Sequence, residues 1–301
     1  MIDIKTNWQG LCTDRPEDAS ICVLGIPFDG GASQGRGAAE APQHIRQLAA
    51  AHMPYTTDDW VLASEPLIYD AGDVEIDLDW GATFRRVETQ AYELMKKGKF
   101  NFFFGGDHSV TIPLHRAFGR WERERNTSAK IGILHFDAHF DLCARFGGHE
   151  WSHANTERRA VEDIISPGDL CFLGIRAAEP DELDFVRAHP EITTISATEV
   201  FTEGYRNAFE IIKEKFQGYD AVYFTLDVDV LDPAYAPGTG TPVAGGISSR
   251  ELIQLVRLVL RELNVTSMDL VEVAPPLDTN DITSWAAIRI FEEVISVFAA
   301  R

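Results

Sequence analysis

Apolar and polar residues along this chain form two recurring patterns. Short apolar runs are typical of buried strands, and longer segments with apolar positions three or four residues apart are typical of amphipathic helices. We expect strands near residues 21–26, 66–70, 101–104, 130–136, 170–174, 192–195, 220–226 and 266–273. We expect helices near residues 42–51, 83–97, 109–119, 179–189, 205–216, 249–262 and 281–299. The alternation of strands and helices predicts an α/β fold with a parallel sheet.

Length and composition are those of an ordinary globular protein. The 301 residues, 45% of them hydrophobic, contain no recognisable linker, so we expect one domain over residues 1–301. No apolar run reaches the roughly 18 residues that a membrane span needs. The segment from Met1 to Thr6 lacks the basic and apolar regions of a signal peptide. We therefore expect a cytoplasmic location, with the four cysteines reduced.

The charge of the chain restricts its partners. Lys and Arg total 27 against 47 Asp and Glu, which gives a formal net charge of −20. This charge disfavours nucleic acid and anionic membranes as partners and would attract a small cationic substrate. The alternative interpretation is a solvated surface that serves solubility.

Two aspartates follow the strand expected at 220–226. Successive side chains of a strand point to opposite faces, so Asp227 and Asp229 are expected on one side. Two carboxylates this close repel each other unless a cation neutralises them. Alternatively, they cap the following loop, as Asp232 before Pro233 is expected to do.

Two further strand ends carry residues of the types that bind metals. Asp137, His139 and Asp141 alternate directly after the run 131–136, and His108 follows the run 102–106. Ligands of α/β proteins bind beyond the carboxyl ends of parallel strands, so the three groups should meet there. His108 alone could be a turn residue, but the joint occurrence favours a metal site.

The expected ligand set combines four carboxylates with two imidazoles: His108, Asp137, His139, Asp141, Asp227 and Asp229. Four negative charges suit two divalent cations, because buried unpaired carboxylates cost on the order of several kcal/mol each. Oxygen-rich ligation with some imidazole favours Mn²⁺, with Ni²⁺, Co²⁺ and Zn²⁺ as alternatives. A metal pair about 3.5–4 Å apart lowers the pKa of a shared water, which predicts hydrolysis.

These segments resemble the ureohydrolase family of arginases, agmatinases and related guanidino-group hydrolases, and agmatinases most of all. The matching segments follow the order and spacing of the family: Gly105-Gly106-Asp107-His108-Ser109, His135-Phe136-Asp137-Ala138-His139-Phe140-Asp141, Thr225-Leu226-Asp227-Val228-Asp229-Val230-Leu231-Asp232-Pro233 and Ser267-Met268-Asp269-Leu270-Val271-Glu272-Val273-Ala274-Pro275. Two more segments, 25–29 and 236–242, extend the resemblance over nearly the whole chain.

The resemblance implies a three-layer α/β/α fold around an eight-stranded parallel sheet, with two Mn²⁺ ions in a cleft at the strand ends. It also implies a homo-oligomer, usually a trimer or hexamer. It further implies that the ligands divide into two shells: His108, Asp137, Asp141 and Asp229 around one metal, and His139, Asp227 and the bridging carboxylates around the other.

The resemblance also implies two roles in catalysis and substrate binding. His153 matches the histidine that follows the Asp-x-His-x-Asp motif and would protonate the departing amine. Glu272 matches the glutamate that orients the guanidinium, which a carboxylate binds bidentately. Together with Asp141 they form the expected catalytic set. Alternatively, His153 is a solvated loop histidine and Glu272 a surface residue.

The loop after Asp141 departs from agmatinases, which commonly continue from the histidine with Gly-Thr and an aromatic residue. Here His153 is followed by Ala154-Asn155-Thr156-Glu157. Arg145 in this loop could pair with a substrate carboxylate, which would favour a guanidino acid over agmatine, or could be a solvated arginine. The segment 137–142 also resembles formimidoylglutamases.

Two classes of function follow from these features. The first is a hydrolase that releases urea from agmatine or a similar guanidino compound, with guanidinobutyrase, guanidinopropionase and formimidoylglutamase activities as variants. The second is a non-catalytic metal-binding paralogue that acts as a partner or regulator. The presence of all six expected ligands, His153 and Glu272 favours the enzyme.

Overall fold

An eight-stranded parallel sheet lies at the centre of the computed structural model, which describes residues 8–52, 57, 58, 60 and 67–300. The strands are β1 (Ile21–Gly25), β2 (Ile68–Asp73), β3 (Phe100–Phe104), β4 (Ile131–Phe136), β5 (Leu170–Ile175), β6 (Thr193–Ser196), β7 (Ala221–Asp227) and β8 (Val265–Val271). Their order is β2-β1-β3-β8-β7-β4-β5-β6, and each neighbouring pair is parallel. The predicted α/β class and parallel sheet are confirmed.

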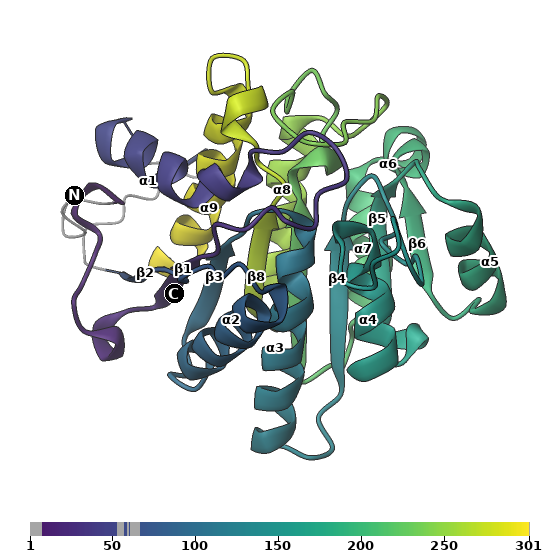
Figure 1. The fold of residues 1–301 in the computed structure, drawn as a ribbon, viewed down its shortest axis with the longest axis horizontal. Coiled ribbons are helices and arrows are strands. Elements are labelled where there is room, and N and C mark those ends of the chain that lie inside the picture. Colours follow the sequence, from purple (N-terminus) through teal and green to yellow (C-terminus); the bar gives the residue numbers. More distant parts are fainter. Residues whose placement is uncertain (1–7, 53–56, 59, 61–66, 301) are drawn as a thin grey trace.

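Helices cover both faces of the sheet (Figure 1). One face carries α2 (Trp80–Met95), α3 (Thr111–Arg125), α4 (Thr156–Asp163) and α5 (Pro180–Ala188). The other face carries α1 (Ala41–His52), α6 (Ala197–Glu203), α7 (Tyr205–Lys215), α8 (Ser249–Glu262) and α9 (Ile282–Ala299). This is the expected three-layer α/β/α arrangement.

The central strands divide their side chains between two hydrophobic cores. In β3, Phe102 and Phe104 pack with Phe291 of α9, while Phe103 lies in the core beneath α2 and α3. Both faces of such a strand are buried, so its sequence is continuously apolar instead of alternating. The short apolar runs in the sequence have this origin.

Two helices, α4 and α6, were not predicted. They are only 8 and 7 residues long, so neither provides enough turns for a clear helical period. Ser196 begins α6 with a capping box, in which its side chain accepts a hydrogen bond from the N–H of Glu199. The predicted strand 66–70 begins at Ile68, and residue 66 lies outside the described residues.

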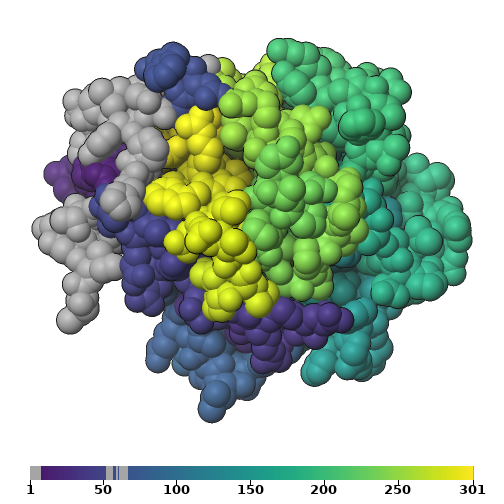
Figure 2. Space-filling model, turned by 90° about the horizontal axis from the view of Figure 1, so that it is seen from above, coloured from purple at the N-terminus to yellow at the C-terminus, as the bar shows by residue number. Residues whose placement is uncertain are grey.

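Segments from the two ends of the chain lie against each other. Figure 2 shows purple and blue N-terminal residues beside the yellow C-terminal segment, and a hydrogen bond of 2.8 Å joins His44 to Asp281. Among the described residues, no helix has both the length and the apolar character that crossing a bilayer requires.

Four adjacent strands, β3, β8, β7 and β4, bring the predicted site residues to one edge of the sheet. The helices that follow β3 and β4 pack on one face, and those that follow β7 and β8 pack on the other. Connections that leave neighbouring strands toward opposite faces open a crevice between them. The candidate site occupies this crevice.

Candidate functional site

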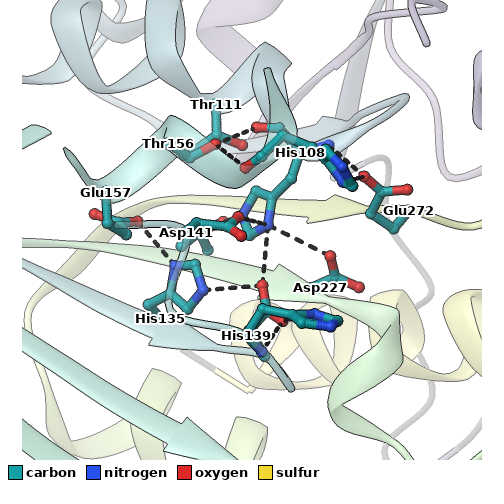
Figure 3. A network of polar contacts seen from close by, with 12 residues as sticks. His108, Thr111, His135, His139, Asp141, Thr156, Glu157, Asp227 and Glu272 are labelled. Atoms are coloured by element: carbon teal, nitrogen blue, oxygen red, sulfur yellow. Dashed lines mark hydrogen bonds and ion pairs between the residues drawn. The ribbon is translucent and has the colours of Figure 1, made fainter. Parts of the chain in front are cut away.

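His108 lies at the centre of the predicted ligand set (Figure 3). Its Nδ1 atom is 3.1 Å from Asp137 Oδ2, 3.0 Å from Asp141 Oδ2 and 3.4 Å from Asp227 Oδ2. The four side chains come from the ends of β3, β4 and β7 and are buried. The structure thus brings together residues that are up to 119 positions apart, from His108 to Asp227.

Tight turns, and not strand alternation, aim the carboxylates. Strand β4 ends at Phe136 and β7 ends at Asp227, so most of the predicted ligands lie beyond the strands. Asp227 Oδ1 accepts from the N–H of Asp229 at 2.8 Å, and Asp137 Oδ1 accepts from the N–H of His139 at 2.6 Å. One oxygen of each carboxylate therefore fixes its turn, while Oδ2 faces His108.

A second group of ligand atoms lies beside the first. His139 Nδ1 is 3.2 Å from both Asp137 Oδ1 and Asp229 Oδ2. Asp229 therefore lies with His139, whereas the resemblance implied a place in the shell of His108. Asp137 contributes an oxygen to each group, so it would be a ligand that two cations at these groups have in common.

The hydrogen bonds of His108 indicate which of its nitrogens is free to bind a metal. Thr225 Oγ1 donates to Asp269 Oδ1 at 2.6 Å, so this hydroxyl must accept its 2.9 Å hydrogen bond from His108 Nε2–H. A neutral ring protonated at Nε2 presents a lone pair at Nδ1. Buried Nδ1 makes no aligned hydrogen bond among the described residues and faces three carboxylates, as a metal ligand would.

The pKa values show why the carboxylates need a cation. Burial, together with repulsion from Asp229 and Asp137, raises the pKa of Asp227 well above 3.8. Burial and Asp137 also raise the pKa of Asp229 to about 6. Burial disfavours a charged His108, but its contacts with Asp137, Asp141 and Asp227 outweigh that effect and raise its pKa. Divalent cations would let all four carboxylates ionise, so the residues fit a metal site.

A buried histidine, His135, contacts the candidate ligand Asp137, and a buried glutamate, Glu157, contacts that histidine in turn. Neither was predicted as a site residue. His135 contacts Asp137 Oδ2 at 3.0 Å through Nε2 and Glu157 Oε1 at 2.9 Å through Nδ1 (Figure 3). His135 precedes Asp137 by two positions, so strand alternation could have placed it on the same side. Glu157 gave no such signal, because it belongs to the unpredicted helix α4.

His153 and Glu272 lie next to the candidate metal ligands around His108. Glu272 Oε1 accepts from the N–H of His108 at 2.8 Å and is 3.5 Å from His153 Nδ1. Burial lowers the pKa of His153, but the contact with Glu272 outweighs burial and raises the pKa to about 9. A histidine with this pKa keeps its proton at neutral pH, as a general acid requires.

Two of the predicted catalytic residues have left-handed backbones. Asp141 has φ +54° and Glu272 has φ +62°, a region that residues other than glycine rarely adopt. The carbonyl of Asp141 accepts from the N–H groups of Glu157 and Arg158, and the N–H of Glu272 donates to the carbonyl of Gly106. Such strain persists where surrounding contacts enforce it, commonly at functional sites.

The loop that differs from agmatinases is fixed by its own residues. Asn155 is fully buried, accepts from Ser152 and donates to the carbonyl of Cys143 at 2.7 Å. Arg145 is exposed and donates to Glu150 Oε1 at 2.9 Å and to the carbonyl of Gly148 at 3.0 Å. The atypical sequence after His153 therefore has a structural role in this loop.

A cleft with a volume of about 280 Å³ opens beside the candidate metal ligands, three of which, His139, Asp141 and Asp227, line it. It is lined by Ser33, Gln34, His139, Asp141, Cys143, Phe146, His153, Ala154, Ala177, Ala178, Glu179, Glu182, Asp227 and Thr241. Its titratable side chains other than the predicted site residues and Cys143 are Glu179 and Glu182, and burial raises the pKa of Glu182 to about 7. Arg145 is not part of the lining. The cleft suits a small molecule with a cationic end.

Comparisons with known proteins agree with this geometry. The Arginase family model matches residues 19–296. An agmatinase of Escherichia coli O7:K1 is 35% identical over 94% of this chain and 89% of its own length. Proclavaminate amidinohydrolase of Streptomyces clavuligerus is 32% identical over 95% of this chain and 90% of its own length.

A solved structure shows the same architecture. The agmatine ureohydrolase of Thermoplasma volcanium superposes with a TM-score of 0.85 at 27% identity, covering 100% of this chain and 95% of the other. The match of family model, relatives and fold along almost the whole chain leaves one assignment. The chain belongs to the arginase family and is a ureohydrolase enzyme.

Proposed function

We propose that this enzyme hydrolyses the guanidino group of agmatine, or of a similar small cationic guanidino compound, to urea and an amine. The observation that carries the proposal is the convergence of four carboxylates and two imidazoles beside the pair His153 and Glu272. A metal group, a proton donor and a guanidinium-binding carboxylate are the three parts that this hydrolysis requires.

Two Mn²⁺ ions are the proposed cofactors. His108, Asp137, Asp141 and Asp227 would hold one ion, and Asp137, His139 and Asp229 would hold the other. The mixture of carboxylate oxygen and imidazole nitrogen suits Mn²⁺, although Ni²⁺, Co²⁺ and Zn²⁺ accept similar ligands. When bound, such a pair supplies a nucleophile by lowering the pKa of a coordinated water.

Glu272 and His153 would act on the substrate itself. Glu272 uses Oε1 for its contacts with His108 and His153, which leaves Oε2 to accept from a guanidinium N–H. His153 lines the cleft, and its contact with the buried Glu272 outweighs its own burial and raises its pKa to about 9, so it holds a proton there at neutral pH. Without a proton, the departing nitrogen would leave as an amide anion, RNH⁻, which is a poor leaving group. Transfer of the proton from His153 lets it leave as a neutral amine.

The charge of the cleft favours an amine over a carboxylate on the substrate tail. Glu179 and Glu182 line the cleft. Burial raises the pKa of Glu182 to about 7, and its two oxygens accept from the N–H groups of Leu142 and Glu179 at 2.8 Å each, so Glu179 is the carboxylate better placed to attract a cationic tail. Arg145, the residue considered for binding a substrate carboxylate, is paired with Glu150 instead. These contacts support a substrate with a cation at both ends, which describes agmatine.

A urea-release assay tests the proposal. The Mn²⁺-loaded enzyme is given agmatine, arginine, guanidinobutyrate, guanidinopropionate and guanidine, with formamide release from formimidoylglutamate measured in parallel. We expect agmatine to give the highest kcat/KM. Preference for a guanidino acid would overturn the substrate assignment, and no turnover with two bound metals would indicate a non-catalytic paralogue.

The variant Arg145→Ala sharpens this assay. We expect it to leave kcat/KM for agmatine within about twofold, because Arg145 does not line the cleft. Its exposed ion pair with Glu150 contributes only roughly 0–1 kcal/mol to the free energy of unfolding, so the fold should also be retained. A selective loss of activity on guanidinobutyrate would instead assign Arg145 to the substrate carboxylate.

We also propose a cytoplasmic homo-oligomer, a trimer or hexamer, as the resemblance to the family implies. The large net negative charge supports the exclusion of nucleic acid and anionic membranes as partners. Sedimentation of the purified protein measures the number of subunits directly.

A further inference from the structure

We propose that Ser33 is a positioning residue that holds the ring of His153 in both of its protonation states. This inference rests on the proposed function, in which His153 releases and regains a proton in every turnover. Ser33 belongs to the loop between β1 and α1, which was not expected to contribute to the site.

Ser33 contacts the side of the ring opposite Glu272. Its Oγ lies 2.9 Å from His153 Nε2, and its peptide N lies 3.3 Å from the same nitrogen. Glu272 Oε1 approaches the other ring nitrogen, Nδ1, at 3.5 Å. The imidazole is therefore placed between a serine and a carboxylate that come from distant parts of the chain.

The chemistry of these contacts differs between the two states of the ring. A protonated imidazole has N–H donors at both nitrogens, so Nε2 needs an acceptor. Of the two described groups that contact Nε2, the hydroxyl of Ser33 can accept and the peptide N–H cannot. A neutral ring protonated at Nδ1 needs a donor at Nε2, which both the hydroxyl and the peptide N–H can provide. The hydroxyl serves both states, whereas the peptide N–H serves only one.

The charged groups around the ring cannot replace this contact. Glu272, Asp141 and Asp107 are the groups whose charges act most strongly on His153. An ionised carboxylate accepts hydrogen bonds but cannot donate to a neutral nitrogen. Burial raises the pKa of Asp107 to about 7, but its oxygens contact Gly31 and Ser109 and not the ring. Ser33 therefore supplies the adjustable partner, and Glu272 supplies the fixed one.

The loop of Ser33 is attached to the turn that carries His108. The N–H of Gly31 donates to Asp107 Oδ2 at 2.7 Å, and the N–H of His153 donates to the carbonyl of Gly31 at 3.3 Å. A Cβ atom at Gly31 would lie 2.5 Å from Ser109 Oγ, so the close approach depends on glycine. These contacts fix the distance between Ser33 and the ring.

Three variants test the role of the hydroxyl in catalysis. Ser33→Ala should lower kcat on agmatine about tenfold, the effect of losing one hydrogen bond, with KM and bound metal unchanged. Ser33→Thr keeps the hydroxyl and should restore kcat to within about threefold. Ser128→Ala is the matched control, because Ser128 is an exposed turn serine near the amino end of β4.

Because Ser33 is exposed, the melting temperature of Ser33→Ala should equal that of the native protein, which separates positioning from folding. A native kcat in Ser33→Ala, or a kcat that Ser33→Thr fails to restore, would overturn the proposal.

A second measurement does not depend on turnover. In the Zn²⁺-loaded protein labelled with ¹⁵N-histidine, the Nε2 resonance of His153, identified by its loss in His153→Asn, should move in Ser33→Ala and return in Ser33→Thr. An Nε2 resonance that is identical in the native protein, Ser33→Ala and Ser33→Thr would refute the hydrogen bond. If the enzyme releases no urea from any guanidino compound, the proposed function fails, while this resonance still tests the contact of Ser33 with His153.

Discussion

The peptide N–H of His108 donates a 2.8 Å hydrogen bond to Glu272 Oε1. This bond joins the turn after β3 to the residue directly after β8, two strands that are neighbours in the sheet. The proposed metal ligand and the proposed guanidinium-binding carboxylate therefore have a fixed separation. Because the two groups are already in place, substrate binding does not have to supply the free energy needed to order them.

The variant Glu272→Gln separates this structural role from substrate binding. Glutamine still accepts from the N–H of His108, so bound metal and melting temperature should not change. The neutral amide cannot form a charge-assisted pair with a guanidinium, so kcat/KM should fall roughly 10–100-fold, in line with about 1.5–3 kcal/mol for hydrogen bonds to charged groups. Steady-state kinetics and metal analysis check both points, and native kcat/KM would argue against the role.

The variant Asp229→Asn tests the second group of ligand atoms. Asp229 Oδ2 lies 3.2 Å from His139 Nδ1, and an amide is a much weaker metal ligand than a carboxylate. We expect the variant to retain about one of two Mn²⁺ ions and to lose activity in parallel. Elemental analysis gives the metal content. Asp232→Asn is the control, since Asp232 caps a loop by accepting from Ala234 and Gly245, and two bound ions with full activity in Asp229→Asn would contradict the assignment.

The variant Thr225→Val tests the support behind His108. Valine keeps the shape of threonine but removes both the acceptor for His108 Nε2–H and the donor to Asp269. The affinity for metal should fall about 10–100-fold, as for other partners of metal ligands. The free energy of unfolding should fall by about 1–3 kcal/mol, because buried polar atoms lose their partners. Thr225→Ser should preserve both quantities, and if it behaves like valine, packing and not hydrogen bonding explains the effect.

The pKa of His153 predicts the alkaline limb of the activity profile. Contact with Glu272 outweighs burial and raises this pKa to about 9. The acid form is therefore present at neutral pH and disappears as the pH rises through about 9, so kcat/KM, which reports groups of the free enzyme, should fall on the alkaline side. Nearby divalent cations disfavour the imidazolium, so metal binding would move this limb to lower pH.

The metal content of His153→Ala and the pH dependence of its activity check this assignment. His153→Ala should retain both metals and lose roughly 10²–10⁴-fold in kcat, together with the alkaline limb. A limb that survives in His153→Ala would identify another group as the acid.

The sequence determined the elements and the residue types of the site. Continuous apolar runs predicted buried strands because both faces of the sheet are covered, and the residues that follow these runs placed His108 and Asp137 beyond their strands and Asp227 at the end of its strand. The periodic segments predicted most helices, except where α4 and α6 were too short. These features are local, since each depends on neighbouring residues alone.

The tertiary structure decided which of these residues meet. Strand order is a long-range property, and no local pattern shows that β3, β8, β7 and β4 lie side by side. For the same reason the pairing of Asp229 with His139, the contact of Glu157 with His135, and the contact of Ser33 with His153 could not be predicted. Hydrogen-bond partners are chosen in space when the chain packs, whereas the sequence specifies only the groups available to form them.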